Sequence, residues 1–445
     1  MKKNSFYLVS LGCAKNTVDS DSIASLLQRE GYSIVSKSSQ AEVMIVNTCG
    51  FIEPARQESI AVLTELAAQK KPGQLLIAAG CLTELLREKL AEDVKGIDGI
   101  IGTRRWMDMP DLVKSLRRDP SKPRYHLPDV PEIGRDEKGI ARVSLRGGSA
   151  YLKIADGCRR LCAYCSIPLI KGKQVSRPME SILRDAEILQ DNGVQELILI
   201  SQDTTDYGSD LGMKDGLVRL LESLLPQIPQ IPWVRILYAY PGYVTDGLID
   251  LMSNAPQVLP YLDMPLQHAS PQVLRAMKRP SNMEWVHSTI AKMRSRMPDL
   301  ALRTTFIVGY PGESEADFQL LIDFVREIEF DHLGVFPFSF ESGTASAPLG
   351  DPIPEEEKLR RREEIMTMQE SISLKRNQQQ IGKTFDVLIE GYGDGISVGR
   401  SYRDAPEIDG LVFVEDKLKI SEINPVQITG ALKHDLLGIS VSNLS

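Results

Sequence analysis

Short apolar runs alternate with helical patterns along the first part of the chain. The runs Phe6–Leu11, Val43–Thr48 and Leu75–Gly80 are almost continuously apolar, which is typical of strands buried on both faces of a parallel sheet. The stretches between them, such as residues 21–30, have the spacing of amphipathic helices. This alternation predicts a doubly wound α/β domain at residues 1–118.

A proline-containing segment separates this series from a second one. Residues 119–148 contain Pro120, Pro123, Pro128 and Pro131 and lack apolar periodicity, so we predict a linker. Between residues 149 and 375, six apolar runs alternate with helical segments, which predicts a full or partial (β/α)6-type parallel barrel. The six runs are residues 150–155, 196–201, 233–239, 261–265, 302–308 and 332–338.

The pattern changes once more near the end of the chain. After a charged helical stretch at residues 354–380, short alternating runs at residues 384–390, 395–401, 410–414 and 425–432 are separated by glycine-rich turns. We therefore predict a small all-β barrel of about five strands within residues 376–445. The predicted fold is thus an α/β multidomain protein with three parts.

Length, charge and composition argue against some classes of protein. The chain has 445 residues, too many for one compact core, and a net charge of −8 that argues against a large nucleic-acid footprint. No apolar run approaches the ~18 residues of a membrane helix. We expect a cytoplasmic protein that does not associate with membranes. In that compartment, clustered cysteines are more often metal ligands than disulfides.

All six cysteines lie just after predicted strands, in two groups of three. The second group forms a CxxxCxxC motif. Open parallel sheets and parallel barrels place their ligands at the carboxyl ends of strands. A four-iron cluster held by three thiolates has one iron open for a substrate or cofactor, so we predict two 4Fe–4S clusters. The predicted ligands are Cys13, Cys49 and Cys81 for one cluster, and Cys158, Cys162 and Cys165 for the other.

Two simpler interpretations of the cysteines are open. The N-terminal three could be small buried thiols, as cysteines often are. The motif at Cys158 could hold zinc, but a structural zinc site normally has a fourth ligand. No His or Cys occurs in residues 166–205.

The CxxxCxxC motif with Tyr164 before its last cysteine resembles the signature of the radical S-adenosylmethionine superfamily. The resemblance implies that the open iron binds the methionine end of the cofactor. An electron from the cluster would then release a 5′-deoxyadenosyl radical. It also implies cofactor contacts from Tyr164 and from later strand ends, here Gln202, Asp203, Gly309 and Glu313. Alternatively, Asp203 caps a helix and Gly309 forms a turn.

The order of domains resembles the methylthiotransferase family over nearly the whole chain. The resemblance implies replacement of C–H by C–S–CH3 with two molecules of S-adenosylmethionine, one methylating a sulfur on the N-terminal cluster. We assign no catalytic residue beyond the cluster ligands. Electrons would come from an external donor such as a flavodoxin. A non-catalytic iron–sulfur carrier or scaffold is the alternative from another class, but it would need neither open clusters nor a barrel.

The substrate is suggested by the C-terminal domain, which resembles the TRAM domain. Residues 381–445 contain six Lys or Arg and ten Asp or Glu, a balance unsuited to phosphates but suited to a basic protein. The segments Ser10–Asn16 and Gly399–Gly410 resemble the family branch that modifies an aspartate of small-subunit ribosomal protein S twelve. We predict this protein as the partner and do not expect RNA binding to dominate. A transfer-RNA adenosine is the alternative substrate, and a merely solvated acidic surface is the simplest interpretation of the charge.

Overall fold

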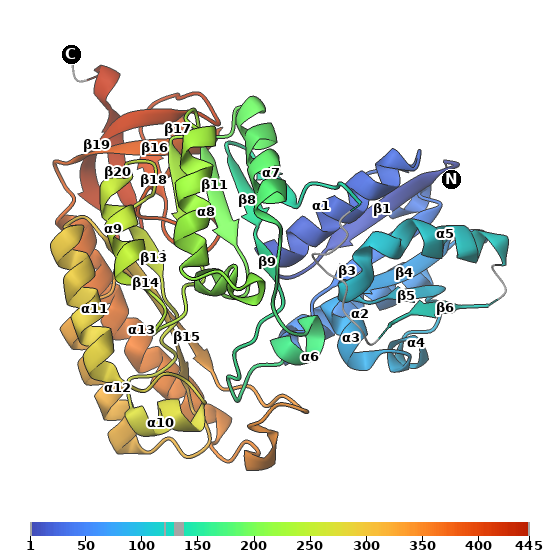
Figure 1. The fold of residues 1–445 in the computed structure, drawn as a ribbon, viewed down its shortest axis with the longest axis horizontal. Helices are drawn as coiled ribbons and strands as arrows, with labels where there is room; N and C mark the ends of the chain where they lie inside the picture. Colours follow the sequence, from blue (N-terminus) through green and yellow to red (C-terminus); the bar gives the residue numbers. More distant parts are fainter. Residues whose placement is uncertain (1, 120–121, 129–137, 444–445) are drawn as a thin grey trace.

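The computed structural model describes residues 2–119, 122–128 and 138–443. Figure 1 shows three parts, an N-terminal α/β domain, a central barrel and a small β-barrel at the C-terminus. The predicted fold class is confirmed. The domain boundaries at residues 118, 148 and 375 stay predictions.

The N-terminal domain is built on a six-stranded sheet in which all neighbouring strands are parallel. The runs predicted at Val43–Thr48 and Leu75–Gly80 form strands in which every residue is buried, as expected for central strands. In sheet order the strands are β2 (Ser33–Ile34), β1 (Ser5–Ser10), β3 (Val43–Thr48), β4 (Leu75–Gly80), β5 (Gly99–Ile101) and β6 (Arg124–His126).

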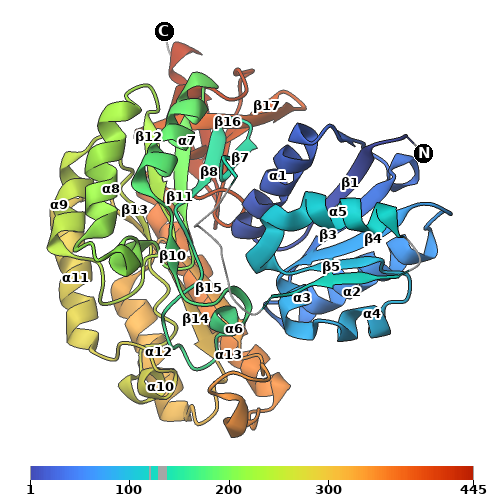
Figure 2. The same ribbon diagram turned by 45° about the vertical axis from the view of Figure 1, so that its right-hand side comes forward.

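Helices cover both faces of this sheet (Figures 1 and 2). On one face, α1 (Ala14–Arg29) and α5 (Met109–Arg118) contribute Leu26 and Leu112 to a single apolar core. On the other, α2 (Glu53–Ala68), α3 (Cys81–Leu86) and α4 (Lys89–Asp93) build a second core. The domain is therefore doubly wound, as predicted.

The central domain is a partial barrel of six parallel strands, with the antiparallel strand β7 (Val143–Arg146) added at one edge. A four-stranded sheet has the order β12-β11-β8-β7 and a three-stranded sheet the order β13-β14-β15. A bridge between Val234 and Val258 leads from the first sheet towards the second. The strands are β7 (Val143–Arg146), β8 (Ser149–Lys153), β11 (Glu196–Ile200), β12 (Trp233–Ile236), β13 (Tyr261–Asp263), β14 (Ala301–Val308) and β15 (His332–Pro337).

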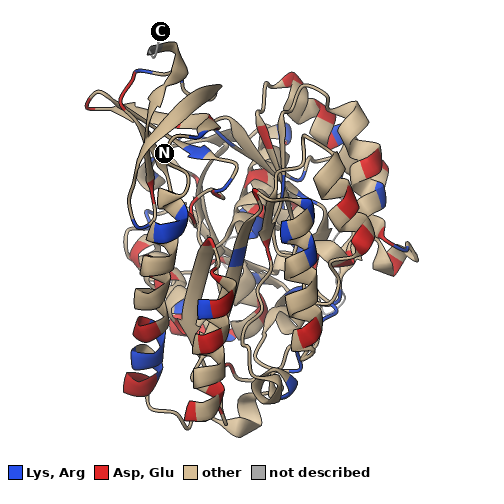
Figure 3. Cartoon of the chain, turned by 90° about the vertical axis from the view of Figure 1, so that its left-hand side faces the viewer, with Lys and Arg blue, Asp and Glu red and all other residues tan. Residues whose placement is uncertain are grey.

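Outer helices pack against these strands and share one large apolar core with them. Figure 3 shows that acidic and basic residues are interspersed on the outer helices rather than separated by sign. These helices are α7 (Met179–Asp191), α8 (Gly216–Leu224), α9 (Asp246–Asn254), α11 (Met283–Arg296), α12 (Glu315–Ile328) and α13 (Glu355–Gln378). The short helix α10 (Pro271–Ala276) contributes Val273 to a separate small cluster with Met277, Tyr310 and Phe338.

The C-terminal domain is a closed five-stranded barrel in the order β16-β17-β18-β20-β19. Four of its strands coincide with predicted runs, whereas β20 was not predicted. They are β16 (Thr384–Gly393), β17 (Ile396–Ser401), β18 (Val412–Val414), β19 (Ile423–Ala431) and β20 (Leu436–Ser440).

The segment predicted as a linker contains two strands that belong to the sheets on either side. The strand β6 completes the N-terminal sheet, and β7 pairs antiparallel with β8. Their apolar content is low because both are edge strands. Residues 120–121 and 129–137, with Pro120 and Pro131, lie outside the described part. Within the described part, no helix combines the length and apolar character required to span a membrane.

Candidate active site

One cavity of about 470 Å³ lies between the N-terminal domain and the barrel. Its wall includes all six cysteines of the chain, which are free thiols. The two groups therefore face one common space although their elements lie in different domains. The sequence predicts that the cysteines lie at the ends of strands. It cannot show that the cysteine-bearing edge of the N-terminal sheet faces the cysteine-bearing end of the barrel.

The N-terminal group is positioned by three strand–helix junctions. Cys13 is the N-cap of α1, Cys49 follows β3, and Cys81 is the first residue of α3. Gly12 has a φ of +90°, and a Cβ there would lie 2.8 Å from the Cβ and 2.9 Å from the Sγ of Cys49. Only glycine allows this close approach between neighbouring junctions.

The barrel group lies in a loop between β9 (Ala155–Asp156) and α6 (Ile167–Lys171). The loop is held by main-chain hydrogen bonds, from the Cys165 amide to the Cys162 carbonyl at 3.1 Å and from the Ala163 amide to the Met277 carbonyl at 2.8 Å. The Arg160 amide donates to the Sγ of Cys158 at 3.4 Å. The loop thus presents its thiols on a fixed backbone.

The thiols differ in their acidity. Burial raises the pKa of Cys81 and of Cys165 to about 12, and that of Cys158 to about 11. Burial also acts to raise the pKa of Cys13, but the nearby Lys15 charge and the Asn16 amide outweigh it and lower the pKa. Of these four thiols, Cys13 is the one whose surroundings favour the thiolate.

The donor set suits iron–sulfur clusters. Thiolates are the ligands that hold such clusters in proteins. Among the described residues, no three or more His, Cys, Asp or Glu are grouped as the ligands of one metal ion would be. A four-iron cluster takes one thiolate on each ligated iron, so its donors are not gathered around a single ion.

Of the residues predicted to contact the cofactor, Tyr164 and Gln202 line the cavity. Asp203 is buried beside it and accepts hydrogen bonds from Arg160 at 2.6 Å and Thr205 at 2.5 Å. Burial raises the pKa of Asp203, and Arg160 opposes that shift. Asp203 acts here as the partner of Arg160, and its contact with the cofactor stays a prediction.

Gly309 and Glu313 form a turn that is not part of the cavity wall. A carboxylate oxygen of Glu313 accepts the amides of Gly309 at 2.5 Å and Tyr310 at 3.0 Å, and Arg361 pairs with the carboxylate at 2.9 Å. A Cβ at Gly309 would meet Lys358. These contacts explain the motif as a turn, and its cofactor role stays a prediction.

Several cavity residues escaped the sequence analysis. Arg279 donates to the Sγ of Cys162 at 3.6 Å and to the Pro265 carbonyl, and its guanidinium lies 4.2 Å from the ring centroid of Tyr240. Arg160 lies 3.6 Å from the ring centroid of Tyr243. The position of Arg160 inside the CxxxCxxC motif could have suggested that it lines the cavity. No feature of the sequence indicates such a role for Arg279.

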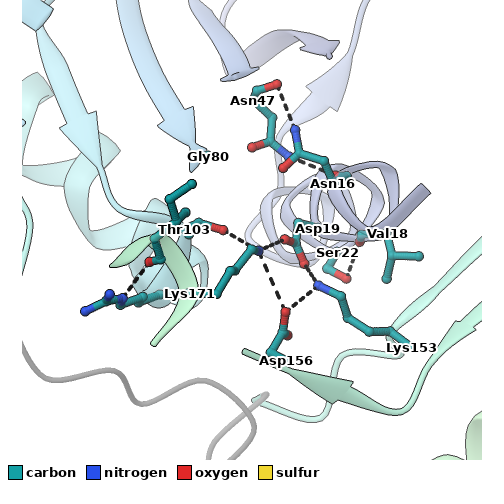
Figure 4. Close-up of polar contacts among 12 residues, drawn as sticks. Asn16, Val18, Asp19, Ser22, Asn47, Gly80, Thr103, Lys153, Asp156 and Lys171 are labelled. Carbon is teal, nitrogen blue, oxygen red and sulfur yellow. Dashed lines mark hydrogen bonds and ion pairs between the residues drawn. The ribbon is translucent and has the colours of Figure 1, made fainter. Parts of the chain in front are cut away.

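A buried charge cluster joins the two domains beside the cavity (Figure 4). Asp19 of α1 accepts Lys153 of β8 at 2.5 Å and Lys171 of α6 at 2.8 Å, and it also pairs with Arg142. Asp156 pairs with Lys153 at 2.8 Å. These oppositely charged contacts fix α1, whose N-cap is Cys13, against the strands that lead to Cys158.

The C-terminal barrel is docked through the segment Gly399–Gly410. Arg400 pairs with the buried Glu196 of β11 at 2.7 Å, and Arg403 pairs with Asp331 at 2.8 Å. Asp409 accepts the hydroxyl of Tyr261 at 2.6 Å. The segment Gly399–Gly410, on which the predicted choice of substrate partly rests, is therefore part of the interface between the C-terminal and central barrels.

Family models match all three parts of the chain. Residues 5–102 match the family described as uncharacterized protein family UPF0004, residues 152–325 match the radical SAM superfamily, and residues 381–441 match the TRAM domain. A ribosomal protein uS12 methylthiotransferase RimO from Roseiflexus sp. (strain RS-1) is 44% identical over 455 residues, covering 97% of this chain and 96% of that protein.

The chain belongs to the RimO family of radical S-adenosylmethionine methylthiotransferases. The RimO from Chloroflexus aurantiacus (strain ATCC 29366 / DSM 635 / J-10-fl) is also 44% identical, over 98% of this chain and 100% of that protein. Membership of the RimO family makes the chain an enzyme, and the superfamily implies a 4Fe–4S cluster and S-adenosylmethionine as cofactors.

A solved structure agrees in fold with this RimO-family chain. The radical S-adenosylmethionine methyltransferase TsrM from Kitasatospora setae, with cobalamin and a 4Fe–4S cluster bound, matches with a TM-score of 0.56 at 13% identity. The match covers 89% of this chain and 81% of TsrM. At this identity the likeness concerns the fold alone.

Proposed function

We propose that this enzyme adds a methylthio group to the β-carbon of an aspartate in small-subunit ribosomal protein S twelve. The observation that carries the proposal is the single cavity lined by two cysteine triads from different domains. The methylthiotransferase reaction needs a radical generator and a sulfur donor close to one substrate atom, and this cavity offers a place for both. The relatives named as uS12 methylthiotransferases support the choice of substrate.

We propose that Cys158, Cys162 and Cys165 hold one 4Fe–4S cluster, and that Cys13, Cys49 and Cys81 hold the second. When bound, the first would supply the electron that cleaves S-adenosylmethionine, and the second would present the sulfur to be transferred. In this proposal the reaction uses two S-adenosylmethionine molecules, with electrons from an external donor such as a flavodoxin.

The residues of the chain supply orientation and shielding. Tyr164, Gln202 and Gln267 line the cavity between the two triads. Tyr240 has its hydroxyl 3.7 Å from the Sγ of Cys162, and Arg279 contacts the same sulfur. The cavity wall is mainly apolar, which would keep water away from a reactive carbon radical.

A second cavity of about 780 Å³ shares Phe51, Tyr164, Gln267 and Phe336 with the first. Phe336 is 54% exposed and Phe51 is 42% exposed, so an aromatic rim lies where the two cavities meet. The lining of the second cavity carries four carboxylates against one lysine, namely Glu53, Glu341, Asp351, Glu355 and Lys358. Arg56 pairs with Glu53 and Glu341, and Lys358 pairs with Asp351 and Glu355, so the four carboxylates outnumber their cations by two. This acidic excess suits an entering segment of a basic ribosomal protein better than a phosphate backbone.

The C-terminal barrel supports the same choice. Arg400 and Arg403 are buried against the central barrel, as are the side chains of Asp404 and Asp409. The interface thus buries two cationic and two acidic side chains of the C-terminal domain. The remaining residues of the domain therefore keep the acidic excess counted from the sequence. We expect the enzyme to act in the cytoplasm, where this substrate is made.

The test is a reaction of the anaerobically reconstituted, reduced enzyme with S-adenosylmethionine and either purified S twelve or unmodified transfer RNA. Mass spectrometry should find a methylthio group on one aspartate of the protein. Modification of the transfer RNA alone would show that the substrate assignment is wrong, while modification of neither would contradict the proposed reaction.

A further inference from the structure

Lys15 is a buried cation in the cavity wall. It is the second residue of α1, two positions after Cys13, and only 8% of its surface is accessible. It lines the cavity that all six cysteines share. Burying an ammonium is costly unless a partner of opposite charge compensates it.

No carboxylate contacts this ammonium. In the described part of the chain, the Lys15 ammonium forms no hydrogen bond or ion pair, and its Nζ lies 3.3 Å from the ring centroid of Tyr238. Lys171, the other lysine of the cavity wall, differs because Asp19 at 2.8 Å and Thr103 at 2.6 Å accept its protons. The charge of Lys171 is thus satisfied by a carboxylate within the protein, whereas Lys15 has an aromatic face and the nearby Cys13 sulfur.

The charge of the Cys13 sulfur also acts on Lys15, but the carboxylate that does so is engaged elsewhere. Asp263 acts on Lys15 through its charge but makes no ion pair with it. Its carboxylate pairs with Arg303 at 3.0 Å and accepts the Tyr238 amide at 3.2 Å. Lys15 therefore lies near the Cys13 sulfur but has no carboxylate partner within the described part of the protein.

The backbone around Lys15 is held in an uncommon conformation. Tyr238 has a φ of +63° and Gln267 a φ of +74°, and both line the cavity. Residues other than glycine rarely adopt such values, which cost about 1–3 kcal/mol each and are found at ligand-binding sites. The ring that supports Lys15 is thus part of a preformed wall.

We propose that Lys15 binds the side-chain carboxylate of the target aspartate, an inference that rests on the proposed function. A carboxylate would give the ammonium the buried partner that it lacks. Because the carboxylate is one bond from the β-carbon, holding it beside Cys13 brings the reacting carbon into the cavity between the two triads. Lys15 then selects aspartate over asparagine, since asparagine has the same shape but no charge.

S-adenosylmethionine also carries a carboxylate. The test must therefore distinguish binding of the aspartate carboxylate from binding of the S-adenosylmethionine carboxylate. We would measure binding of fluorescently labelled S twelve, with its target residue as Asp or Asn, to the reconstituted protein. Calorimetry would give the affinity for S-adenosylmethionine. Wild type would be compared with Lys15→Met, Lys15→Arg and the control Lys37→Met, which replaces an exposed lysine outside the cavity.

Lys15→Met should weaken binding of the aspartate form by roughly 30- to 1000-fold, the effect of removing one partner of a buried charge pair. Its affinity for the asparagine form, its iron content and its affinity for S-adenosylmethionine should match wild type. Lys15→Arg should retain a preference for aspartate, which keeps the test decisive if the methionine variant loads iron poorly.

Three results would overturn the inference. Lys15→Met could retain the wild-type preference for aspartate, Lys15→Arg with intact clusters could lose it, or the affinity lost in Lys15→Met could be that for S-adenosylmethionine. The proposed function fails separately, if wild type adds no methylthio group to S twelve.

Discussion

Replacing Glu196 with Gln should loosen the contact between the central and C-terminal barrels. Glu196 begins β11 and is fully buried. Its carboxylate accepts Arg235 at 2.6 Å and Arg400 of β17 at 2.7 Å. The amide of Gln is neutral, so both guanidinium groups would lose their buried counter-charge.

The magnitude follows from the acidity of this carboxyl. Burial alone raises its pKa, but the charges of Arg400 and Arg235 outweigh burial and lower the pKa from 4.5 to about 2. Such a shift corresponds to about 3 kcal/mol of folding free energy. This agrees with the ~3–5 kcal/mol cost of breaking a buried ion pair. Because the folded-state pKa is lowered, the contribution is complete above about pH 4.5 and disappears as the pH falls towards 2.

Equilibrium unfolding in denaturant, followed by tryptophan fluorescence, would measure the effect. Trp233 is paired with Glu196 in the β11–β12 register and contributes to the signal. Glu196→Gln should be less stable than wild type by about 3 kcal/mol at pH 7, and this difference should shrink by about 2 kcal/mol at pH 3. The control Glu363→Gln, at an exposed position of α13, should change stability by less than ~0.5 kcal/mol. A loss below about 1 kcal/mol at pH 7, or a difference independent of pH, would show that the buried Glu196 carboxylate does not stabilise the protein through its charge.

Two further substitutions test how the cavity is assembled. Asp19→Asn should destabilise the docking of α1 by about 3 kcal/mol, because Lys153 and Lys171 lose a buried counter-charge. Hydrogen exchange in α1 and β8 should become faster, and unchanged exchange would contradict this prediction. Gly12→Ala should reduce the iron bound after reconstitution from about eight to about four per chain, since its Cβ would collide with Cys49. The control Gly391→Ala meets no atom within 4 Å, and equal iron in both variants would contradict the close-approach argument.

The central strands could be predicted because their burial is visible in the sequence. Val43–Thr48 and Leu75–Gly80 are buried at every position and were predicted with the bounds that the structure has. The edge strands β2 and β6 are short and partly polar, so no apolar run marks them. The strand β7 was assigned to a linker for the same reason, and β20 is a short run whose pairing depends on barrel closure.

The site was only partly predictable. The cysteines could be found because their spacing and their strand-end positions are local features of the sequence. Lys15 and Arg279 were missed because their importance depends on contacts with Tyr238 and Cys162, which are far away in the chain. Asp203 was predicted to contact the cofactor, but the sequence could not reveal its ion pair with Arg160.

The proposed function gives the two cysteine triads separate roles in one cavity. Its most direct test replaces each triad with Ala and measures iron, 5′-deoxyadenosine and methylthiolated S twelve in parallel. Each triple variant should bind about four irons where wild type binds about eight. The variant lacking Cys13, Cys49 and Cys81 should still release 5′-deoxyadenosine but form no methylthio product, while the variant lacking Cys158, Cys162 and Cys165 should form neither. Retention of about eight irons by either variant, or methylthiolation without the N-terminal triad, would contradict this assignment of roles.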